Sequence, residues 1–260
     1  MLRLNSFLIE PRLRGLVAGS NEWFRAQQEI LRAKRATRRA YEIWYREQLA
    51  DLESAPPGGK VLEIGSGAGF LKELLPEAIT SDLEPGISDR VVDARALPFA
   101  DRSLRGIFLS HAFHHIPDVR RFLAEASRTL VPGGVVSMIE VARSPLSKLV
   151  FGKLHPEPYR DDAADWELAG AKSSYDSNQA LSWIVFVRDR ARFESEFPEL
   201  RIERVRGLPW LAYLLSGGVI QRSLIPSPAL PLAFRLDDWT RPLARWCGLH
   251  WVITLRKAGR

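Results

Sequence analysis

A glycine-rich stretch near residue 65 carries the clearest signal for chemistry in this chain. Residues 61–69 read ValLeuGluIleGlySerGlyAlaGly, so a short apolar run leads into Gly65, Gly67 and Gly69. Glycine allows positive φ angles and lets the backbone approach a ligand without a Cβ clash. In an open α/β sheet such a turn lies at the carboxyl ends of the strands, where these folds bind ligands. The spacing departs from the dinucleotide fingerprint G-x-G-x-x-G, because Phe70 stands where that pattern has its third glycine.

An acidic residue follows the next short apolar run. Asp82 comes directly after residues 78–81, which read as a strand. A carboxylate can accept hydrogen bonds from two neighbouring hydroxyls, as a ribose presents them. An acidic residue about 20 positions after the glycines binds ribose in dinucleotide folds. Taken alone, Asp82 is better explained as a turn residue.

Three histidines follow a later apolar run. Residues 110–118 read SerHisAlaPheHisHisIleProAsp and include His111, His114 and His115. Imidazole has an ordinary pKa of about 6.5 and is the natural general base for a hydroxyl that must lose its proton. His111 is the first candidate because it is nearest the strand end, and His114 is the second. The alternative is that these histidines only shape the floor of a pocket. We expect no metal ion there, because histidines on such a loop more often pack or hydrogen-bond.

The elements that must position these residues alternate between strand and helix. Strands are predicted at 60–64, 78–81, 91–92, 106–110, 135–141, 201–205 and 250–255, and helices at 21–53, from 70 to 75, at 118–130 and at 179–193. The glycine turn opens the helix predicted at 70–75, and Asp118 is the expected N-cap of the helix at 118–130. Strands alternating with helices predict an α/β fold with a parallel sheet covered on both faces, and right-handed crossovers make it doubly wound.

Several of these segments together resemble one known family, the class I S-adenosylmethionine-dependent methyltransferases, in their methyltransferase-11 or UbiE-like branch. The resemblance covers about residues 58–141. It rests on Glu63 with the three glycines, on AspLeu at 82–83, on ValValAspAlaArgAlaLeuProPhe at 91–99, on the histidine string and on LeuValProGlyGly at 130–134. One departure is SerLeuArg at 103–105, where family members commonly have Ser-Phe-Asp.

The resemblance implies a Rossmann-like, mostly parallel seven-stranded sheet and S-adenosyl-L-methionine as the cofactor. The implied cofactor-binding residues are Glu63, Gly65, Gly67, Gly69, Asp82, Leu83, Asp93, Ala94 and Ser110. In the family the glycine turn packs against the methionine part and ribose of the cofactor, and the residue at Leu83 packs on the adenine. The carboxylate at Asp93 accepts from the adenine amino group, and a backbone amide near Ala94 meets a ring nitrogen. Methyl transfer from a sulfonium depends chiefly on alignment and needs no metal.

The chain divides by composition into two parts. Residues 1–57 are expected to form an N-terminal helical extension and residues 58–260 the methyltransferase domain, with a lid or substrate insertion at about 208–248. The basic, aromatic helix at 21–53 could lie on a membrane surface, cover a pocket or simply pack with a solvated face. Aromatic residues expected either in the core or around an apolar pocket are Tyr159, Trp166, Trp183, Trp210, Tyr213 and Trp239.

Composition narrows the functional classes. The chain has 260 residues, a formal net charge of +6 and one cysteine, Cys247, which excludes an intramolecular disulfide and a cysteine-based zinc cluster. No signal peptide or membrane-spanning stretch is visible. We therefore expect a cytoplasmic enzyme, with peripheral contact at the inner membrane face as a further expectation. The 13 residues 208–220 are apolar enough to dip into such an interface.

The predicted reaction is direct methyl transfer to an oxygen, nitrogen or carbon of a small-molecule or lipid- or glycan-linked acceptor. The alternatives are an RNA methyltransferase and a catalytically inactive S-adenosylmethionine-binding scaffold. The basic helix permits the RNA reading, but nucleic acid is an unlikely partner because no RNA-binding module is visible. The glycine spacing argues against a nucleotide-dependent oxidoreductase. The sequence leaves the acceptor and the oligomeric state open.

Overall fold

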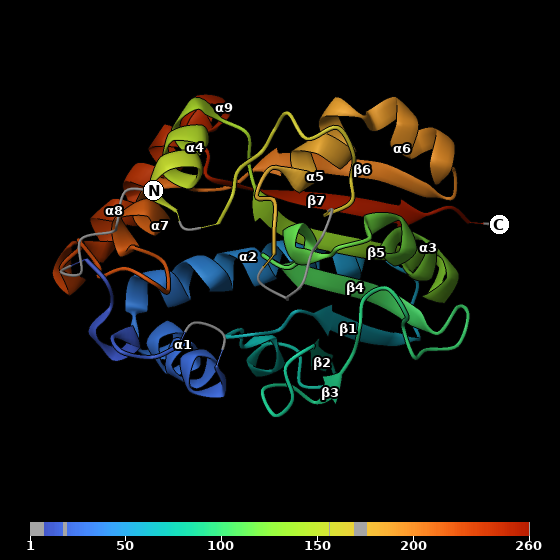
Figure 1. The fold of residues 1–260 in the computed structure, drawn as a ribbon, viewed down its shortest axis with the longest axis horizontal. Coiled ribbons are helices and arrows are strands. Elements are labelled where there is room, and N and C mark those ends of the chain that lie inside the picture. The colour runs from blue at the N-terminus through green and yellow to red at the C-terminus, as the bar shows by residue number, and fades with distance from the viewer. Residues whose placement is uncertain (1–7, 18–19, 156, 169–175, 260) are drawn as a thin grey trace.

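The computed structural model describes residues 8–17, 20–155, 157–168 and 176–259, and a seven-stranded sheet lies at its centre (Figure 1). The strands are β1 (Lys60–Ile64), β2 (Ile79–Asp82), β3 (Arg90–Val91), β4 (Leu104–Ser110), β5 (Leu130–Val141), β6 (Leu200–Gly207) and β7 (His250–Lys257). Their order is β3-β2-β1-β4-β5-β7-β6. The first five pair in parallel, and β7 is antiparallel to both β5 and β6. This confirms the predicted doubly wound, mostly parallel α/β sheet.

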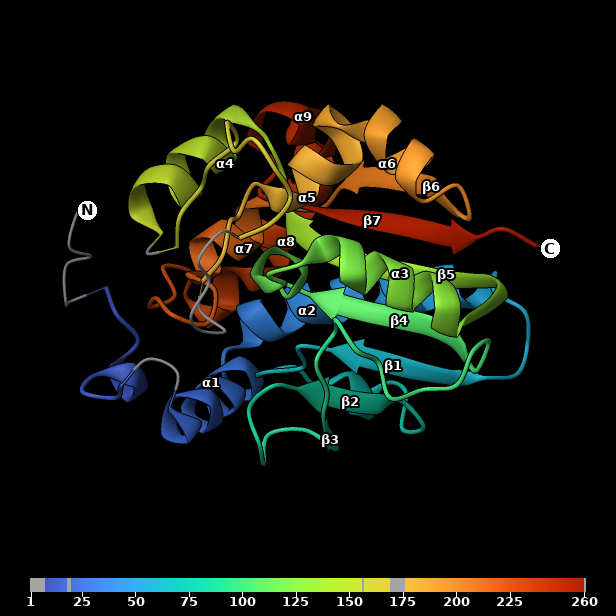
Figure 2. The same ribbon diagram turned by 45° about the vertical axis from the view of Figure 1, so that its right-hand side comes forward.

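Helices cover both faces of the sheet (Figure 2). The helices are α1 (Asn21–Ala33), α2 (Arg35–Glu53), α3 (Val119–Thr129), α4 (Pro145–Leu149), α5 (Leu181–Trp183), α6 (Arg190–Glu196), α7 (Leu211–Ser216), α8 (Leu230–Thr240) and α9 (Ala244–Cys247). Two π-helical segments, Val150–Leu154 and Ile184–Arg188, continue α4 and α5. The expected N-cap of α3 is confirmed, because Asp118 accepts a hydrogen bond from the backbone N–H of Arg121 at 3.0 Å.

Helix α2 belongs to the core of the sheet domain. Its side chains Tyr45 and Leu52 are buried in one cluster with Val61 of β1, Phe108 of β4 and Val135 of β5. The opposite face of the sheet packs against α3 and α5. The predicted domain boundary at residue 57 stays a prediction. In the structure, α2 covers one face of the sheet, as crossover helices do in other doubly wound sheets.

The helix predicted from Phe70 is wrong. Only a 3₁₀ turn at Leu71–Glu73 forms, and the described connections from β2 to β3 and from β3 to β4 hold no helix. The glycine turn ends in Phe70, whose backbone is not helical and whose buried ring packs beside Tyr45 at a centroid distance of 5.2 Å. Since α2 already covers this face, little space is left for a crossover helix there.

The helix predicted at 21–53 forms, but it is interrupted at Lys34. The backbone of this residue is extended, with φ −81° and ψ 92°, and it ends α1 and begins α2. Its ammonium donates to the carbonyl oxygens of Gly218, at 2.6 Å, and of Gln221. These are contacts to a segment 184 or more positions away, so local sequence alone does not predict the break.

The insertion at 208–248 folds into α7, α8 and α9 at one end of the molecule, where α4 also lies (Figure 1). A buried carboxylate fixes its centre. Asp237 of α8 accepts hydrogen bonds from the backbone N–H groups of Trp210, Leu211 and Ala212 at 2.6–2.9 Å. Among the described residues, no helix combines the length and the apolar character needed to cross a membrane.

Candidate functional site

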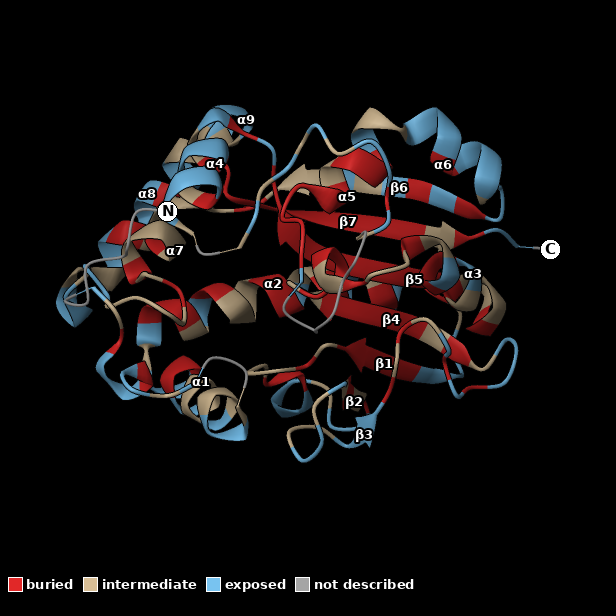
Figure 3. Ribbon diagram, in the orientation of Figure 1, coloured by how far each residue is buried: buried red, intermediate tan, exposed pale blue. Residues whose placement is uncertain are grey.

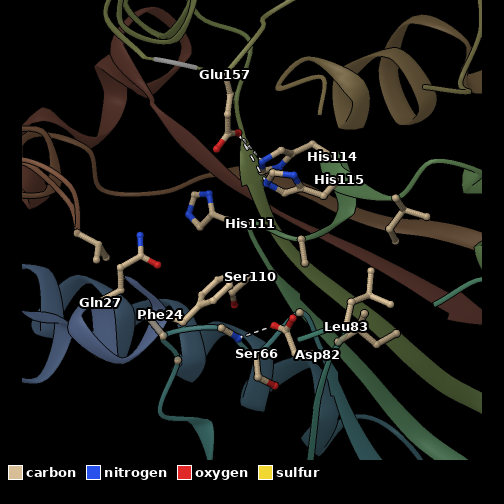
Figure 4. Close-up of a pocket in the computed structure, with 18 of the residues that line it drawn as sticks. Phe24, Gln27, Ser66, Asp82, Leu83, Ser110, His111, His114, His115 and Glu157 are labelled. Carbon is tan, nitrogen blue, oxygen red and sulfur yellow. Dashed lines mark hydrogen bonds and ion pairs between the residues drawn. The ribbon is translucent and has the colours of Figure 1, made fainter. Parts of the chain in front are cut away.

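A cavity of about 780 Å³ opens at the carboxyl ends of β1, β2 and β4 (Figure 4). Ligand sites commonly have volumes of about 300–1,000 Å³, and in open α/β sheets they lie at this edge. Asp82 and the glycine turn line one end, and His111, His114 and Glu157 line the other. The two ends therefore offer different chemistry to one bound ligand or to two neighbouring ones.

The glycine turn needs its glycines for two different reasons. Gly65 has φ +65°, and a Cβ there would lie 2.5 Å from the Cβ of Ala112, so a side chain would clash with the loop after β4. Gly67 has φ +43°, and its N–H donates to Oδ2 of Asp82 at 2.9 Å. A Cβ on Gly67 would meet only two atoms, at 3.8 and 4.0 Å, and would point into open space beside the cavity.

Glu63 lies beneath this turn and does not line the cavity. Tyr45 of α2 donates a hydrogen bond to Oε1 of Glu63 at 3.0 Å and accepts one from the backbone N–H of Phe70 at 3.2 Å. Burial raises the pKa of Glu63 to about 7. A Cβ on Gly69 would lie 2.3 Å from the Tyr45 hydroxyl, so this glycine allows the Tyr45–Glu63 pair to reach the turn.

Asp93 follows β3 and lines the same end of the cavity. Its carboxylate accepts hydrogen bonds from the backbone N–H of Arg95 at 2.8 Å and from the Arg95 guanidinium at 2.7–3.1 Å. Hydrogen bonding to Arg95 holds the pKa of Asp93 below its ordinary value. This carboxylate is therefore ionised and oriented before any ligand arrives.

Helix α1 closes the cavity from the N-terminal side. Trp23, Phe24 and Gln27 line it, and the side-chain amide of Gln28 donates to the carbonyl oxygen of Gly67 at 2.9 Å. Of the three roles open to the 21–53 segment, covering the pocket is the one that these contacts match.

His111 stands at the end of β4 in a backbone conformation that is uncommon outside glycine, with φ +58°. Its N–H donates to the carbonyl oxygen of Ile139 at 2.9 Å. The ring lies among Trp44 and His250, at centroid distances of 5.1 and 4.7 Å, and its Nε2 has no hydrogen-bond partner among the described residues. Burial lowers the pKa of His111 to about 4.

His114 is held between two carboxylates, and Figure 4 shows one of them, Glu157. Its Nδ1 lies 2.6 Å from Oε2 of Glu140 on β5, and its Nε2 lies 3.3 Å from Oε2 of Glu157. Gln179 also donates to Oε2 of Glu157. Burial alone would lower the pKa of His114, but the two carboxylates outweigh it and raise that pKa to about 10. His114 is therefore a buried imidazolium at neutral pH.

Comparisons with known proteins match the part of the chain that carries the glycine turn and the histidine loop. A family model described as "Methyltransferase domain" matches residues 62–138. Over 130 residues the chain is 28% identical to a 2-phytyl-1,4-naphtoquinone methyltransferase of Thermosynechococcus vestitus, which covers 42% of this chain and 57% of the relative. Over 111 residues it is 31% identical to a demethylmenaquinone methyltransferase of Corynebacterium urealyticum, covering 38% of this chain and 48% of the relative. The chain thus matches about half the length of these curated relatives.

Residues 62–138 thus match a methyltransferase-domain family, and the curated relatives include demethylmenaquinone and UbiE methyltransferases. A solved structure agrees with the fold: a chain from the complex of the Haloferax volcanii Trm112 methyltransferase activator with a methyltransferase superposes with a TM-score of 0.51. Its sequence identity is 17%, and the match covers 90% of this chain and 98% of that chain.

The cofactor of this methyltransferase family is S-adenosyl-L-methionine, and the cavity end at the glycine turn fits it. Asp82 uses one lone pair of each carboxylate oxygen for the backbone N–H groups of Gly67 and Glu84, so each oxygen keeps a second lone pair for a ribose hydroxyl. The open space over Gly67 would be filled by a Cβ, and glycine leaves it to a ligand.

Eight of the nine residues predicted to bind the cofactor line the cavity, and Glu63 is the exception. Both predicted catalytic residues, His111 and His114, line it as well. Of the aromatic residues named from the sequence, Tyr213 lines the cavity. Trp166 is fully buried, where its indole N–H donates to Asp189, and Trp239 is 81% exposed.

Other cavity residues were missed from the sequence. They are chiefly Trp23, Phe24, Tyr41, Phe151, His155, Glu157 and Gln179. Glu157 and Gln179 lie more than 40 positions after the histidines in the chain. A contact over that distance follows from no sequence spacing.

The loop that carries Glu157 also contributes to a group of residues that could hold a metal ion, although none is expected from the sequence. Among the described residues, His114, His115 and Glu157 offer three ligand atoms that lie within 4.8 Å of one another. Both ring nitrogens of His114 already face a carboxylate, which explains the cluster without an ion. The expectation stays a prediction.

Replacing Glu140 by glutamine is expected to lower the free energy of unfolding by about 3 kcal/mol at pH 7, because the buried His114 imidazolium loses its closest counter-charge. The folded-state pKa of His114, about 10, lies above its ordinary 6.5. The contribution of the pair is therefore full below pH 6.5 and is lost as the pH rises through 10. Urea unfolding of both proteins at pH 7 and pH 10 should show the difference shrinking at the higher pH.

The matched control for this prediction is Glu194→Gln. Glu194 is exposed and pairs with Arg190 at 2.8 Å, and such surface pairs contribute at most about 1 kcal/mol. A loss as small for Glu140→Gln as for this control would mean that His114 is not charged in the folded protein.

Proposed function

We propose that this protein transfers a methyl group from S-adenosyl-L-methionine to an acceptor bound in the histidine-lined end of the cavity. The observation that supports this most is the layout of one continuous cavity. Asp82, Asp93 and the glycine turn lie at one end, and His111 lies at the other beside apolar and aromatic side chains. When bound, the cofactor supplies an electrophilic methyl group on a positively charged sulfur.

Different residues of the chain would position different parts of the cofactor. Asp82 would accept the ribose hydroxyls and Asp93 the adenine amino group, with Leu83 against the adenine and Ala94 offering a backbone amide. Gly65, Gly67 and Gly69 would let the backbone follow the methionine part, and Ser110 lines the cavity between the two ends. Glu63 would act through Tyr45, by holding the turn in place.

The acceptor end suits a molecule with an apolar body. Tyr41, Phe151, Tyr213, Val219 and Ile220 line it, together with the histidines. The relatives at 28–31% identity are named for quinone acceptors that carry isoprenoid chains, which supports an acceptor of small-molecule or lipid-linked type. A lipid-linked acceptor would also account for the peripheral membrane contact expected from the sequence.

His111 is the residue best suited to take a proton from a hydroxyl acceptor. Its buried ring is neutral at physiological pH, and its Nε2 is without a partner among the described residues. His114 is unsuited to that role because it is already protonated. Its role in this proposal is to position the loop that carries His111 and to hold Glu157 across the cavity.

The test has two stages. Isothermal titration of the purified protein with S-adenosylmethionine and S-adenosylhomocysteine should give binding to both, and no heat with either would overturn the proposal. The protein is then incubated with methyl-labelled cofactor and a bacterial extract that is afterwards split into organic-soluble, aqueous small-molecule and RNA fractions. Label in the organic fraction supports a lipid-linked acceptor, and label in RNA alone would overturn the acceptor class.

A further inference from the structure

Helices α8 and α9 present their large apolar side chains outward. Leu232, Leu236, Trp239, Leu243 and Trp246 follow one another at spacings of four and three residues, and all five are exposed, Trp239 by 81% and Trp246 by 54%. On an ordinary surface helix residues at this spacing face the core. Here the usual arrangement is inverted, and we name these five residues the outer stripe.

The inward face of α8 explains why the inversion is stable. Its two buried residues, Ala233 and Asp237, are small or polar, and Phe234 beside them faces Trp44 and Tyr213. Asp237 holds the three backbone N–H groups at the start of α7, so turning the helix to bury the outer stripe would break three hydrogen bonds to a carboxylate. The loss of three charge-assisted hydrogen bonds at a buried carboxylate opposes such a rotation. The stripe is therefore fixed facing solvent.

The outer stripe is continuous with the walls of the cavity. Helix α4 contacts α9 and, with the π-helical segment after it, adds exposed Leu149 and Leu154 to the same end of the molecule (Figure 3). Phe151 of that segment lines the cavity. On the other side, Val219 and Ile220 line the cavity just before the chain enters the α8 region. Exposed apolar surface and acceptor end thus share two chain segments.

The charges around the stripe favour one kind of partner. Residues 221–248 hold four arginines and two aspartates, and one of these aspartates, Asp237, is buried. Arg235 of α8, Arg241 between the two helices and Arg245 of α9 are exposed, and Arg245 stacks on the ring of Trp246 at 5.2 Å. Aromatic and aliphatic side chains interleaved with arginines are typical of helices that lie in the headgroup region of anionic bilayers.

We propose that the outer stripe docks this protein on an anionic lipid bilayer, with α8 and α9 lying in the plane of the interface. About 20 apolar residues of helix are needed to cross a bilayer, and no described helix combines that length with that apolar character. A second copy of the chain fits less well, because an isologous contact would bring like-charged arginines of the two copies together. The route by which a lipid acceptor enters the cavity from the bilayer rests on the proposed function, whereas the docking itself does not.

The experiment is co-sedimentation of the full chain with vesicles of phosphatidylcholine, with and without phosphatidylglycerol. We expect binding to the vesicles that contain phosphatidylglycerol and weaker binding as salt rises. The double variant Trp239→Ser, Trp246→Ser should lower the vesicle-bound fraction at equal lipid by about tenfold, since two amphipathic aromatic anchors are removed. Val187→Ser, an exposed valine between α5 and α6, is the matched control and should bind as the wild type does.

Two results would overturn the docking proposal. One is wild-type protein that stays in the supernatant with phosphatidylglycerol vesicles, and the other is a double variant that sediments as the wild type does. A concentration-dependent dimer that the same two substitutions abolish, without vesicle binding, would assign the stripe to a second copy. Titration with S-adenosylhomocysteine keeps the two proposals separate: the double variant should bind it as the wild type does, whatever the vesicles show.

Discussion

Asp82→Ala is expected to weaken the binding of S-adenosylhomocysteine by about 100-fold, or roughly 2.7 kcal/mol at 25 °C. Two effects add. The variant loses the acceptor proposed for both ribose hydroxyls, and hydrogen bonds to a charged group contribute about 1.5–3 kcal/mol each. It also frees the backbone N–H of Gly67, which now donates to Asp82 at 2.9 Å and helps fix the turn. Isothermal titration gives the dissociation constants.

Glu84→Gln is the control for this variant. It changes a carboxylate two residues away that does not line the cavity. Cofactor affinity should stay within about twofold of the wild type, since the Glu84 side chain lies outside the cavity and its backbone N–H to Asp82 is kept. Equal affinity of Asp82→Ala and wild type, with unchanged thermal unfolding, would remove Asp82 from the cofactor site.

The parallel core of the fold is readable from the sequence because its signals are local. The first four strands were each found within two residues, whereas β5 begins at Leu130, five residues before the predicted start, and runs through ProGlyGly at 132–134. The cap at Asp118 was also found, since an N-cap acts within one helical turn. The missing helix after Phe70 and the interruption at Lys34 were not predicted. Both depend on contacts with α2 or with residues 218–221, which come together only in the folded chain.

The residues of the candidate site also fall into those that local sequence predicts and those that depend on distant contacts. Residues at strand ends, such as Asp82 and His111, were found because parallel strands bring their carboxyl ends to one edge. Glu63 was assigned to the cofactor on its place in the motif, but its burial beneath the turn depends on Tyr45 of α2. Glu140 was missed because a charged residue within an apolar strand gives no sign of its partner. In the folded chain its partner is His114, from the preceding loop.

The N-terminal helices link these observations. Tyr45 supports the turn from below, Gln28 holds Gly67 from the side, and Trp44 packs against the His111 ring. One pair of helices therefore positions both the cofactor end and the acceptor end of the cavity. Changes in α1 or α2 should then affect both ends, although only a few of their residues line the cavity.

His111→Asn is expected to lower turnover by about 100-fold or more while leaving cofactor affinity within about twofold, because a positioned general base contributes about 10²–10⁴ in rate. Asparagine is the better first choice because it tolerates the positive φ at this position, whereas His111→Ala adds backbone strain to the loss of the ring. The measurement is kcat with a hydroxyl acceptor identified by the labelling experiment, beside titration with S-adenosylhomocysteine.

The pH profile separates a base from a residue that only fills space. Burial among aromatic rings lowers the pKa of His111 to about 4, so the neutral ring is already the main form above pH 5. The acid limb of the kcat/KM profile should therefore lie well below 6.5, and a positively charged cofactor nearby would move it lower still. In His111→Asn that limb should disappear along with most of the rate. A variant with reduced turnover but an unchanged acid limb would show that His111 shapes the pocket and that another group takes the proton, and unchanged turnover would remove His111 from the reaction altogether.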